Sequence, residues 1–251
     1  MTAELKVAEK VAAFFDLDGT LIPEPSLERR LFAQLRYGHR IPLANYLRWV
    51  AETVRLLPNG LLAAQYGNKR YLTGVPRDLV FRHMGPIVFF QEGIARVAWH
   101  ARQGHEIVIV SGTLDLLAEL AAIALGCELE VRGISIRPHV SATCLQQNRG
   151  RWTGHIKGEA LYGAAKARSV EAIARQERID LRQSHAYGNS LLDRHMLLAV
   201  GHGHAVNPGK DLAAVANEKH WPVWHWHLEK QLACKQKSYL PEEIHHIEGP
   251  A

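Results

Sequence analysis

Short apolar runs that end in polar turns occur three times along the chain. Residues 11–17 (VAAFFDL) lead into DGT, residues 106–110 (EIVIV) lead into SGT, and residues 184–190 (SHAYGNS) repeat the pattern. A short apolar run closed by turn residues is typical of a buried strand. Two shorter runs, at residues 204–206 and 221–226, are expected to add edge strands.

Helical patterns lie between these runs. They cover residues 93–103, 114–125 and 160–177, and Gly104 and Gly126 are placed to end the first two helices. Strands that alternate with helices predict an α/β fold, a Rossmann-like parallel sheet covered on both faces. The three polar turns then fall at the carboxyl ends of strands, the edge at which open α/β sheets bind ligands.

The segment 22–88 interrupts this alternation because it contains helical patterns and no strand pattern. We expect helices near residues 26–38, 42–57, 60–73 and 76–85. The segment is interpreted as a helical-bundle cap inserted into the α/β domain. The predicted organisation is a core of residues 1–21 and 89–226, a cap of residues 22–88 and a C-terminal tail of residues 227–251. A β-hairpin is also predicted at residues 141–156, around the turn NRGR.

Composition narrows the class of protein. The chain has 251 residues, 47% of them hydrophobic, and a net charge of +5. It has no dense Lys/Arg run of the kind that indicates nucleic-acid binding, and no apolar run of membrane-spanning length. Three scattered cysteines and an N-terminus without an apolar segment favour a cytoplasmic protein with reduced thiols. Oligomeric state is not indicated.

The turn DLDGT carries the strongest chemical signal. Asp16 and Asp18 lie two residues apart at a strand end, and Gly19 allows the chain to turn. Two carboxylates this close do not both ionise easily, so one pKa rises. One group is then suited to act as an anionic nucleophile and the other as a proton donor.

Three later features are ambiguous when taken singly. Ser111 precedes a predicted helix and can bind an anion with nearby N–H groups, or simply cap that helix. Lys166 lies near a helix start, where it can neutralise phosphate or face solvent. The turn GNSLLD offers Asn189 and Asp193 as oxygen ligands for a hard cation such as magnesium.

Together these motifs resemble the haloacid dehalogenase (HAD) superfamily of phosphatases. The segments FFDLDGTL, VIVSGT, KARSV and YGNSLLDRHML are similar to its four motifs in the same order. The cap, between the first and second motifs, resembles that of subclass IB, the phosphoserine phosphatase-like enzymes. The resemblance extends from Phe14 to about Trp226 and implies the HAD fold.

The resemblance also implies residue roles. Asp16 would attack phosphorus and form a phosphoaspartyl intermediate, and Asp18 would protonate the leaving oxygen and then activate water. Phosphate would be bound by Ser111, Gly112 and Lys166. Mg²⁺ would be the cofactor, held by Asp16, Asp18, Asn189 and Asp193. The expected substrate is a small phosphorylated metabolite.

Two positions depart from the family pattern. The fourth motif usually begins with an aspartate where this chain has Asn189, which removes one negative charge from the metal side. We therefore expect weaker magnesium binding at a site that still binds phosphate. Phosphoserine phosphatases place a glutamate nine residues after the nucleophile, where this chain has Pro25, so phosphoserine is less favoured as substrate.

The main hypothesis is a magnesium-dependent phosphatase that hydrolyses a small organic phosphomonoester. A phosphotransferase or phosphonate hydrolase of the same superfamily is the enzymatic alternative. A catalytically silent phosphate-binding protein is the alternative from another class. The chain has fifteen histidines, but the closely spaced His202, His204, His225 and His227 lack a cysteine or acidic partner pattern, so zinc is not predicted.

Overall fold

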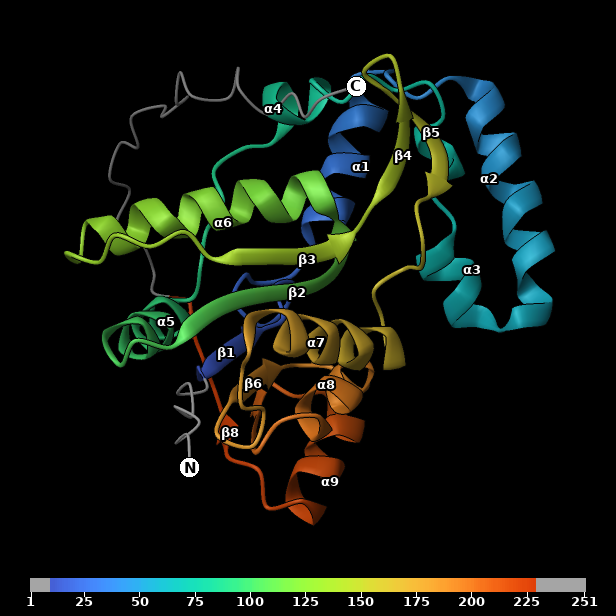
Figure 1. Ribbon diagram of the computed structural model, residues 1–251. Helices are drawn as coiled ribbons and strands as arrows, with labels where there is room; N and C mark the ends of the chain where they lie inside the picture. The colour runs from blue at the N-terminus through green and yellow to red at the C-terminus, as the bar shows by residue number, and fades with distance from the viewer. Residues whose placement is uncertain (1–9, 229–251) are drawn as a thin grey trace, which may run out of the picture.

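The computed structural model describes residues 10–228 (Figure 1). Within them, one sheet has six parallel strands in the order β3-β2-β1-β6-β7-β8. This arrangement confirms the predicted α/β class and puts β1 at the centre, between β2 and β6. The strands are β1 (Ala12–Phe15), β2 (Glu106–Leu114), β3 (His139–Thr143), β6 (His185–Gly188), β7 (His202–Val206) and β8 (Val223–Trp224).

Helices cover both faces of the sheet. Successive residues of β1 point to opposite faces, and all four are buried, which shows that neither face is open to solvent at this strand. Ala13 and Phe15 belong to one apolar core, and Ala12 and Phe14 belong to the other. The first core includes α5 (Gln91–Arg102) and α6 (Asp115–Glu130), and the second includes α7 (Ala164–Glu177), α8 (Arg194–Leu198) and α9 (Lys210–Glu218) (Figure 1).

The chain between β1 and α5 is helical, as the sequence predicts. It forms α1 (Leu27–Tyr37), α2 (Leu43–Leu56), α3 (Leu61–Gly67) and α4 (Leu79–His83), with short 3₁₀ turns at Leu57–Asn59 and Arg70–Leu72. The helix expected over 60–73 is interrupted at Asn68, whose side-chain amide donates to the Trp49 carbonyl at 2.7 Å and accepts from the Arg70 N–H at 3.1 Å. The division of the chain into a core and a cap stays a prediction.

A separate hairpin, β4 (Leu145–Asn148) and β5 (Arg151–Ile156), packs against this helical segment. The Gly74 N–H donates to the Trp152 carbonyl at 2.7 Å, and the Trp152 N–H donates to the Val75 carbonyl at 3.0 Å. Trp152 is only 2% exposed. The hairpin therefore links the part of the chain after β3 to the segment inserted after β1.

The structure corrects three local expectations. Residues 141–143 belong to β3 of the main sheet and pair with β2, so the predicted hairpin begins only at Leu145. Gly126 does not end α6, which continues to Glu130; a Cβ at this position would make an ordinary contact, at 3.4 Å, with the Ile136 carbonyl. Residues 111–114 continue β2 instead of forming a turn.

No helix within residues 10–228 is long and apolar enough to cross a membrane. Residues 1–9, predicted to contain no signal peptide, and all but the first two residues of the predicted tail 227–251 lie outside the described residues.

Candidate active site

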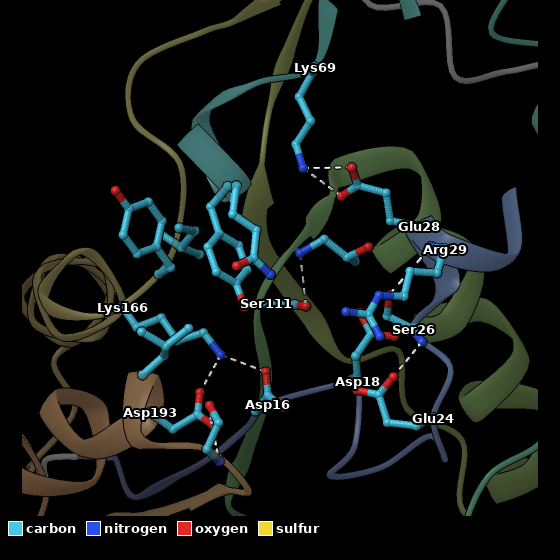
Figure 2. Close-up of a pocket in the computed structure, with 18 of the residues that line it drawn as sticks. Asp16, Asp18, Glu24, Ser26, Glu28, Arg29, Lys69, Ser111, Lys166 and Asp193 are labelled. Carbon is cyan, nitrogen blue, oxygen red and sulfur yellow. Dashed lines mark hydrogen bonds and ion pairs between the residues drawn. The ribbon is translucent and has the colours of Figure 1, made fainter. Parts of the chain in front are cut away.

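A cavity of about 440 Å³ lies where the carboxyl ends of β1, β2 and β6 meet the helical segment (Figure 2). The central position of β1 explains this location. The neighbours of β1 are β2 on one side and β6 on the other, and the loops after these strands diverge and leave a crevice at their carboxyl ends. All the residues predicted for catalysis, phosphate binding and metal binding line this cavity: Asp16, Asp18, Ser111, Gly112, Lys166, Asn189 and Asp193.

Lys166 lies between two buried carboxylates, as Figure 2 shows. Its Nζ donates to Oδ1 of Asp16 at 2.5 Å and to Oδ1 of Asp193 at 2.6 Å. Exposure is 5% for Asp16, 4% for Lys166 and 1% for Asp193. Lys166 is the third residue of α7, so the start of this helix brings the ammonium group to the end of β1. An ammonium group has three donors, so one remains for an oxygen of a ligand.

Charge at this centre is unbalanced. Burial raises the pKa of Asp16 to about 7; Lys166 opposes this shift, and the Asp193 carboxylate adds to it. Burial by itself lowers the pKa of Lys166, but Asp16 and Asp193 together outweigh burial and raise it. One buried cation therefore faces two buried carboxylates, and the centre favours a further positive charge.

Asp18 has different surroundings from Asp16. Its Oδ1 accepts the backbone N–H of Leu27, the first residue of α1, at 2.8 Å. Burial raises the pKa of Asp18 to about 6; the Leu27 N–H opposes this shift, and nearby Glu24 contributes to it. Thr20 Oγ1 instead donates to Oδ2 of Asp16 at 2.9 Å. The two carboxylates are thus held separately, as their different predicted roles require.

Ser111 and Gly112 lie at the end of β2. The Thr113 N–H donates to Oγ of Ser111 at 3.2 Å, so the Ser111 O–H is free to donate to a ligand. A side chain at Gly112 would lie 3.2 Å from the Leu161 carbonyl and 3.8 Å from the Tyr66 ring. Helix α6 begins at Asp115 with Leu114 as its N-cap, which confirms the predicted helix start near Leu114; the alternative that Ser111 simply caps this helix is wrong.

The loop after β6 is fixed by Asp193. Its Oδ2 accepts the N–H groups of Asn189 and Ser190 at 3.2 and 2.9 Å and the Ser190 hydroxyl at 2.8 Å. The Asn189 amide lies against the DLDGT turn, since a Cβ at Gly19 would be 2.0 Å from its Nδ2. Glycine at position 19, where φ is 85°, therefore allows the two predicted metal-side loops to meet.

On the opposite side of the cavity lies an ion pair that sequence reasoning missed. Lys69 is 3% exposed and donates to both oxygens of Glu28 at 2.6 and 2.7 Å, and the Tyr71 hydroxyl donates to the same carboxylate at 2.7 Å (Figure 2). Phe32 and Trp49 pack around Tyr71 with ring centroids 5.2 and 6.1 Å from it. No local sequence pattern predicts an ion pair between residues that are 41 positions apart. The sequence shows only that Glu28 and Lys69 are charged residues in a helical segment.

Comparison with known proteins agrees with this fold. The family model for haloacid dehalogenase-like hydrolases matches residues 13–198. A probable phosphatase of Mycobacterium tuberculosis strain H37Rv is 30% identical over 230 residues, covering 85% of this chain and 75% of the relative.

Two solved structures share the fold. A protein of unknown function from Bordetella pertussis has a TM-score of 0.63 at 23% identity and covers 86% of this chain and 99% of its own. A phosphoserine phosphatase with an analogue of its phospho-aspartyl intermediate has a TM-score of 0.60 at 20% identity, covering 87% and 94%. With the family model matching most of its length, the chain belongs to the haloacid dehalogenase-like hydrolases.

Proposed function

We propose that the protein is a magnesium-dependent phosphatase that hydrolyses a small organic phosphomonoester through a phosphoaspartyl intermediate on Asp16. The observation that carries the proposal is the Asp16–Lys166–Asp193 arrangement at the floor of a cavity that also contains Ser111 and Asp18. A nucleophilic carboxylate, a buried lysine and a second carboxyl group of raised pKa are the components that such a two-step transfer needs.

In this proposal Asp16 attacks phosphorus, and the ester oxygen leaves with a proton from Asp18. The raised pKa of Asp18, about 6, keeps a useful fraction protonated near neutral pH. Asp18 then accepts a proton from water as the water attacks the phosphoaspartate. The Ser111 hydroxyl, the Gly112 N–H and the third donor of Lys166 bind the phosphoryl oxygens and stabilise their charge.

The atoms at this corner fit a hard divalent cation. Asp16 and Asn189 offer side-chain oxygens. The backbone N–H groups of the turn after Asp18 donate to the carbonyls of Leu17 and Ile22, so within this turn the Asp18 carbonyl is left for a metal ion. Magnesium prefers such oxygen ligands. When bound, Mg²⁺ supplies positive charge that reduces repulsion between the nucleophile and the phosphate.

Asp193 was also predicted as a metal ligand. Its Oδ1 contacts Lys166, and its Oδ2 accepts three hydrogen bonds from the loop. We therefore assign Asp193 to holding Lys166 and Asn189 in position, and we place Asp16, Asp18 and Asn189 at the metal.

The substrate's organic part would face the helical segment. Glu28 is already paired with Lys69 and Tyr71, so it is not free to bind a substrate amine. Glu24 lines the cavity and is exposed, but its carboxylate accepts the Ser26 N–H at 2.9 Å. Pro25 and the paired Glu28 support a substrate other than phosphoserine, whereas one hydrogen bond leaves Glu24 with further acceptor sites for a cationic group.

The test is hydrolysis of p-nitrophenyl phosphate with Mg²⁺ by the full chain and by its Asp16→Asn variant. We expect release by the wild type and a loss of at least about 10³-fold in the variant, since the covalent route is removed. Asp211→Asn, at an exposed aspartate on α9, is the matched control and should keep wild-type activity. Equal release by wild type and Asp16→Asn would refute the proposal.

Asn189 supports one alternative from another class, a catalytically silent phosphate-binding protein, because the metal side has one carboxylate fewer than the family pattern. Calorimetric titration with inorganic phosphate separates the two functions. Phosphate binding without metal-dependent hydrolysis of any phosphomonoester in a metabolite panel would favour the silent protein. Adding alcohol acceptors and phosphonates to the same panel tests the transferase and phosphonate alternatives.

A further inference from the structure

A group of histidines lies at the opposite edge of the sheet from the cavity. His185 is the first residue of β6, His105 immediately precedes β2, and His100 lies near the end of α5. These three residues are named the histidine cluster. Asn189 follows the other end of β6, so this strand, about 13 Å long at roughly 3.3 Å per residue, separates the cluster from the candidate active site.

The cluster has the spacing of a metal site. Each of its histidines offers a ring nitrogen within 4.8 Å of a ring nitrogen of each of the other two. Nδ1 of His100 lies 2.9 Å from Nδ1 of His105. In a tetrahedral zinc site with Zn–N distances of about 2.0–2.1 Å, two ligand nitrogens are roughly 3.4 Å apart. Small movements of these rings would therefore produce ligand geometry.

Neighbouring side chains orient the imidazoles. The Tyr187 hydroxyl lies 2.8 Å from Nε2 of His100 and can accept a hydrogen bond from the Nε2–H, which leaves Nδ1 of His100 unprotonated. Nε2 of His204 lies 3.1 Å from Nδ1 of His185. Metal-binding histidines usually donate their second ring N–H to an acceptor, as His100 does toward Tyr187.

The histidines are held in the neutral form that binds metal. Burial lowers the pKa of His100 to about 2 and that of His185 to about 4, and it also lowers the pKa of His105. His100 is fully buried, whereas His105 and His185 are half-buried, so an ion can enter from the surface. Neutral imidazole suits zinc and similar transition metals, whereas magnesium prefers oxygen.

We propose that the histidine cluster of His100, His105 and His185 binds a divalent transition-metal ion, zinc foremost, with water completing the coordination. The ion would connect α5, the turn before β2 and the start of β6, and so stabilise the sheet at a distance from the reaction. The sequence pattern does not predict this site, because the three histidines come from three separate parts of the fold.

Two features limit the affinity. The Arg96 guanidinium lies 4.3 Å from the Trp224 ring, and its charge helps to lower the pKa of His100 and His185. Trp224 donates to His204 at 3.3 Å, which makes His204 the donor toward His185, and this hydrogen bond has to rearrange when metal binds. We therefore expect a Kd on the order of micromolar, about −8 kcal/mol.

The test is calorimetric titration of the full chain with Zn²⁺ in excess Mg²⁺, which occupies the oxygen-rich site. The wild type should bind one equivalent with micromolar affinity, and His105→Gln and His185→Gln should weaken this binding at least about tenfold. His225→Gln, at an exposed histidine outside the cluster, is the matched control and should bind as the wild type does. Equal zinc affinity in all four proteins would overturn the proposal.

A measurement on the wild type guards against variants that fail to fold. In histidine-selective NMR, signals of the three cluster imidazoles should shift on Zn²⁺ addition and stop shifting at one equivalent. The midpoint temperature of thermal unfolding should rise in the same titration. At a free Zn²⁺ concentration of 100 times the Kd, binding should add about 2.7 kcal/mol to the free energy of unfolding. The proposal is wrong if zinc shifts other histidines and leaves these three unchanged.

Discussion

Replacing Lys166 with methionine removes a buried charge while keeping the length of the side chain. Its Nζ lies 2.5 and 2.6 Å from the carboxylates of Asp16 and Asp193, and the three side chains are 1–7% exposed. At an effective dielectric constant of about 20, each contact corresponds to roughly 6 kcal/mol of attraction, most of which offsets the cost of burying the charges. Removing one member of such a network typically destabilises a protein by about 3–5 kcal/mol.

We expect Lys166→Met to lie at the lower end, about 3 kcal/mol, because Asp16 can relieve the repulsion by taking up a proton; burial already raises its pKa to about 7. Urea unfolding followed by circular dichroism, in the presence of EDTA, should show a midpoint lower by about 1 M. Lys157→Met, at an exposed lysine, is the control and should change stability by less than about 0.5 kcal/mol. A Lys166→Met protein within about 1 kcal/mol of the wild type would refute the electrostatic account of this centre.

Three further changes test the surroundings of this centre. Asn189→Asp adds one negative charge beside the proposed metal site, and a unit charge near 4 Å corresponds to about 4 kcal/mol before compensation. Calorimetry should therefore show Mg²⁺ binding at least about tenfold more tightly than to the wild type. Unchanged Mg²⁺ affinity would contradict the assignment of residue 189 to the metal site. Gly188→Ala puts a Cβ 2.5 Å from Cβ of Asp193, so this displacement should lower kcat by at least about tenfold. Gly85→Ala, whose Cβ would meet open space, is the control and should keep wild-type kcat. Equal kcat values in the two variants would count against a role in catalysis for the loop after β6. Lys69→Met leaves the partly buried Glu28 carboxylate with the Tyr71 hydroxyl as its remaining partner. The variant should lose about 1–3 kcal/mol of stability in thermal unfolding and have a higher KM; a change below about 0.5 kcal/mol would show that the pair is unimportant.

The fold and the membership of the site follow from local sequence patterns. The apolar runs before DLDGT, SGT and GNS are short and bounded by turn residues, and parallel strands bring their carboxyl ends to one edge. That rule is sufficient to place Asp16, Ser111 and Asn189 around one cavity before any contact is known. Lys166 needed the family resemblance, because a single lysine near a helix start carries no signal of burial.

Contacts between distant segments could not be predicted in this way. The run at 141–145 is continuous in sequence, yet it divides between β3 and β4 because Ser141 pairs with β2 and Leu145 with β5. The local pattern predicts that Gly126 ends a helix, but α6 continues through it to Glu130. The Glu28–Lys69 pair and the histidine cluster depend on packing between elements, which hydrophobic periodicity does not specify.

The proposed mechanism requires Asp16 to become covalently phosphorylated. The most direct measurement mixes the protein with a phosphomonoester and Mg²⁺, quenches in acid within one turnover, and maps the phosphoryl group by mass spectrometry of peptides. We expect a phosphoaspartate at Asp16 in the wild type and none in Asp16→Asn. Turnover without any phosphorylated aspartate, or with the phosphoryl group on a residue other than Asp16, would contradict it.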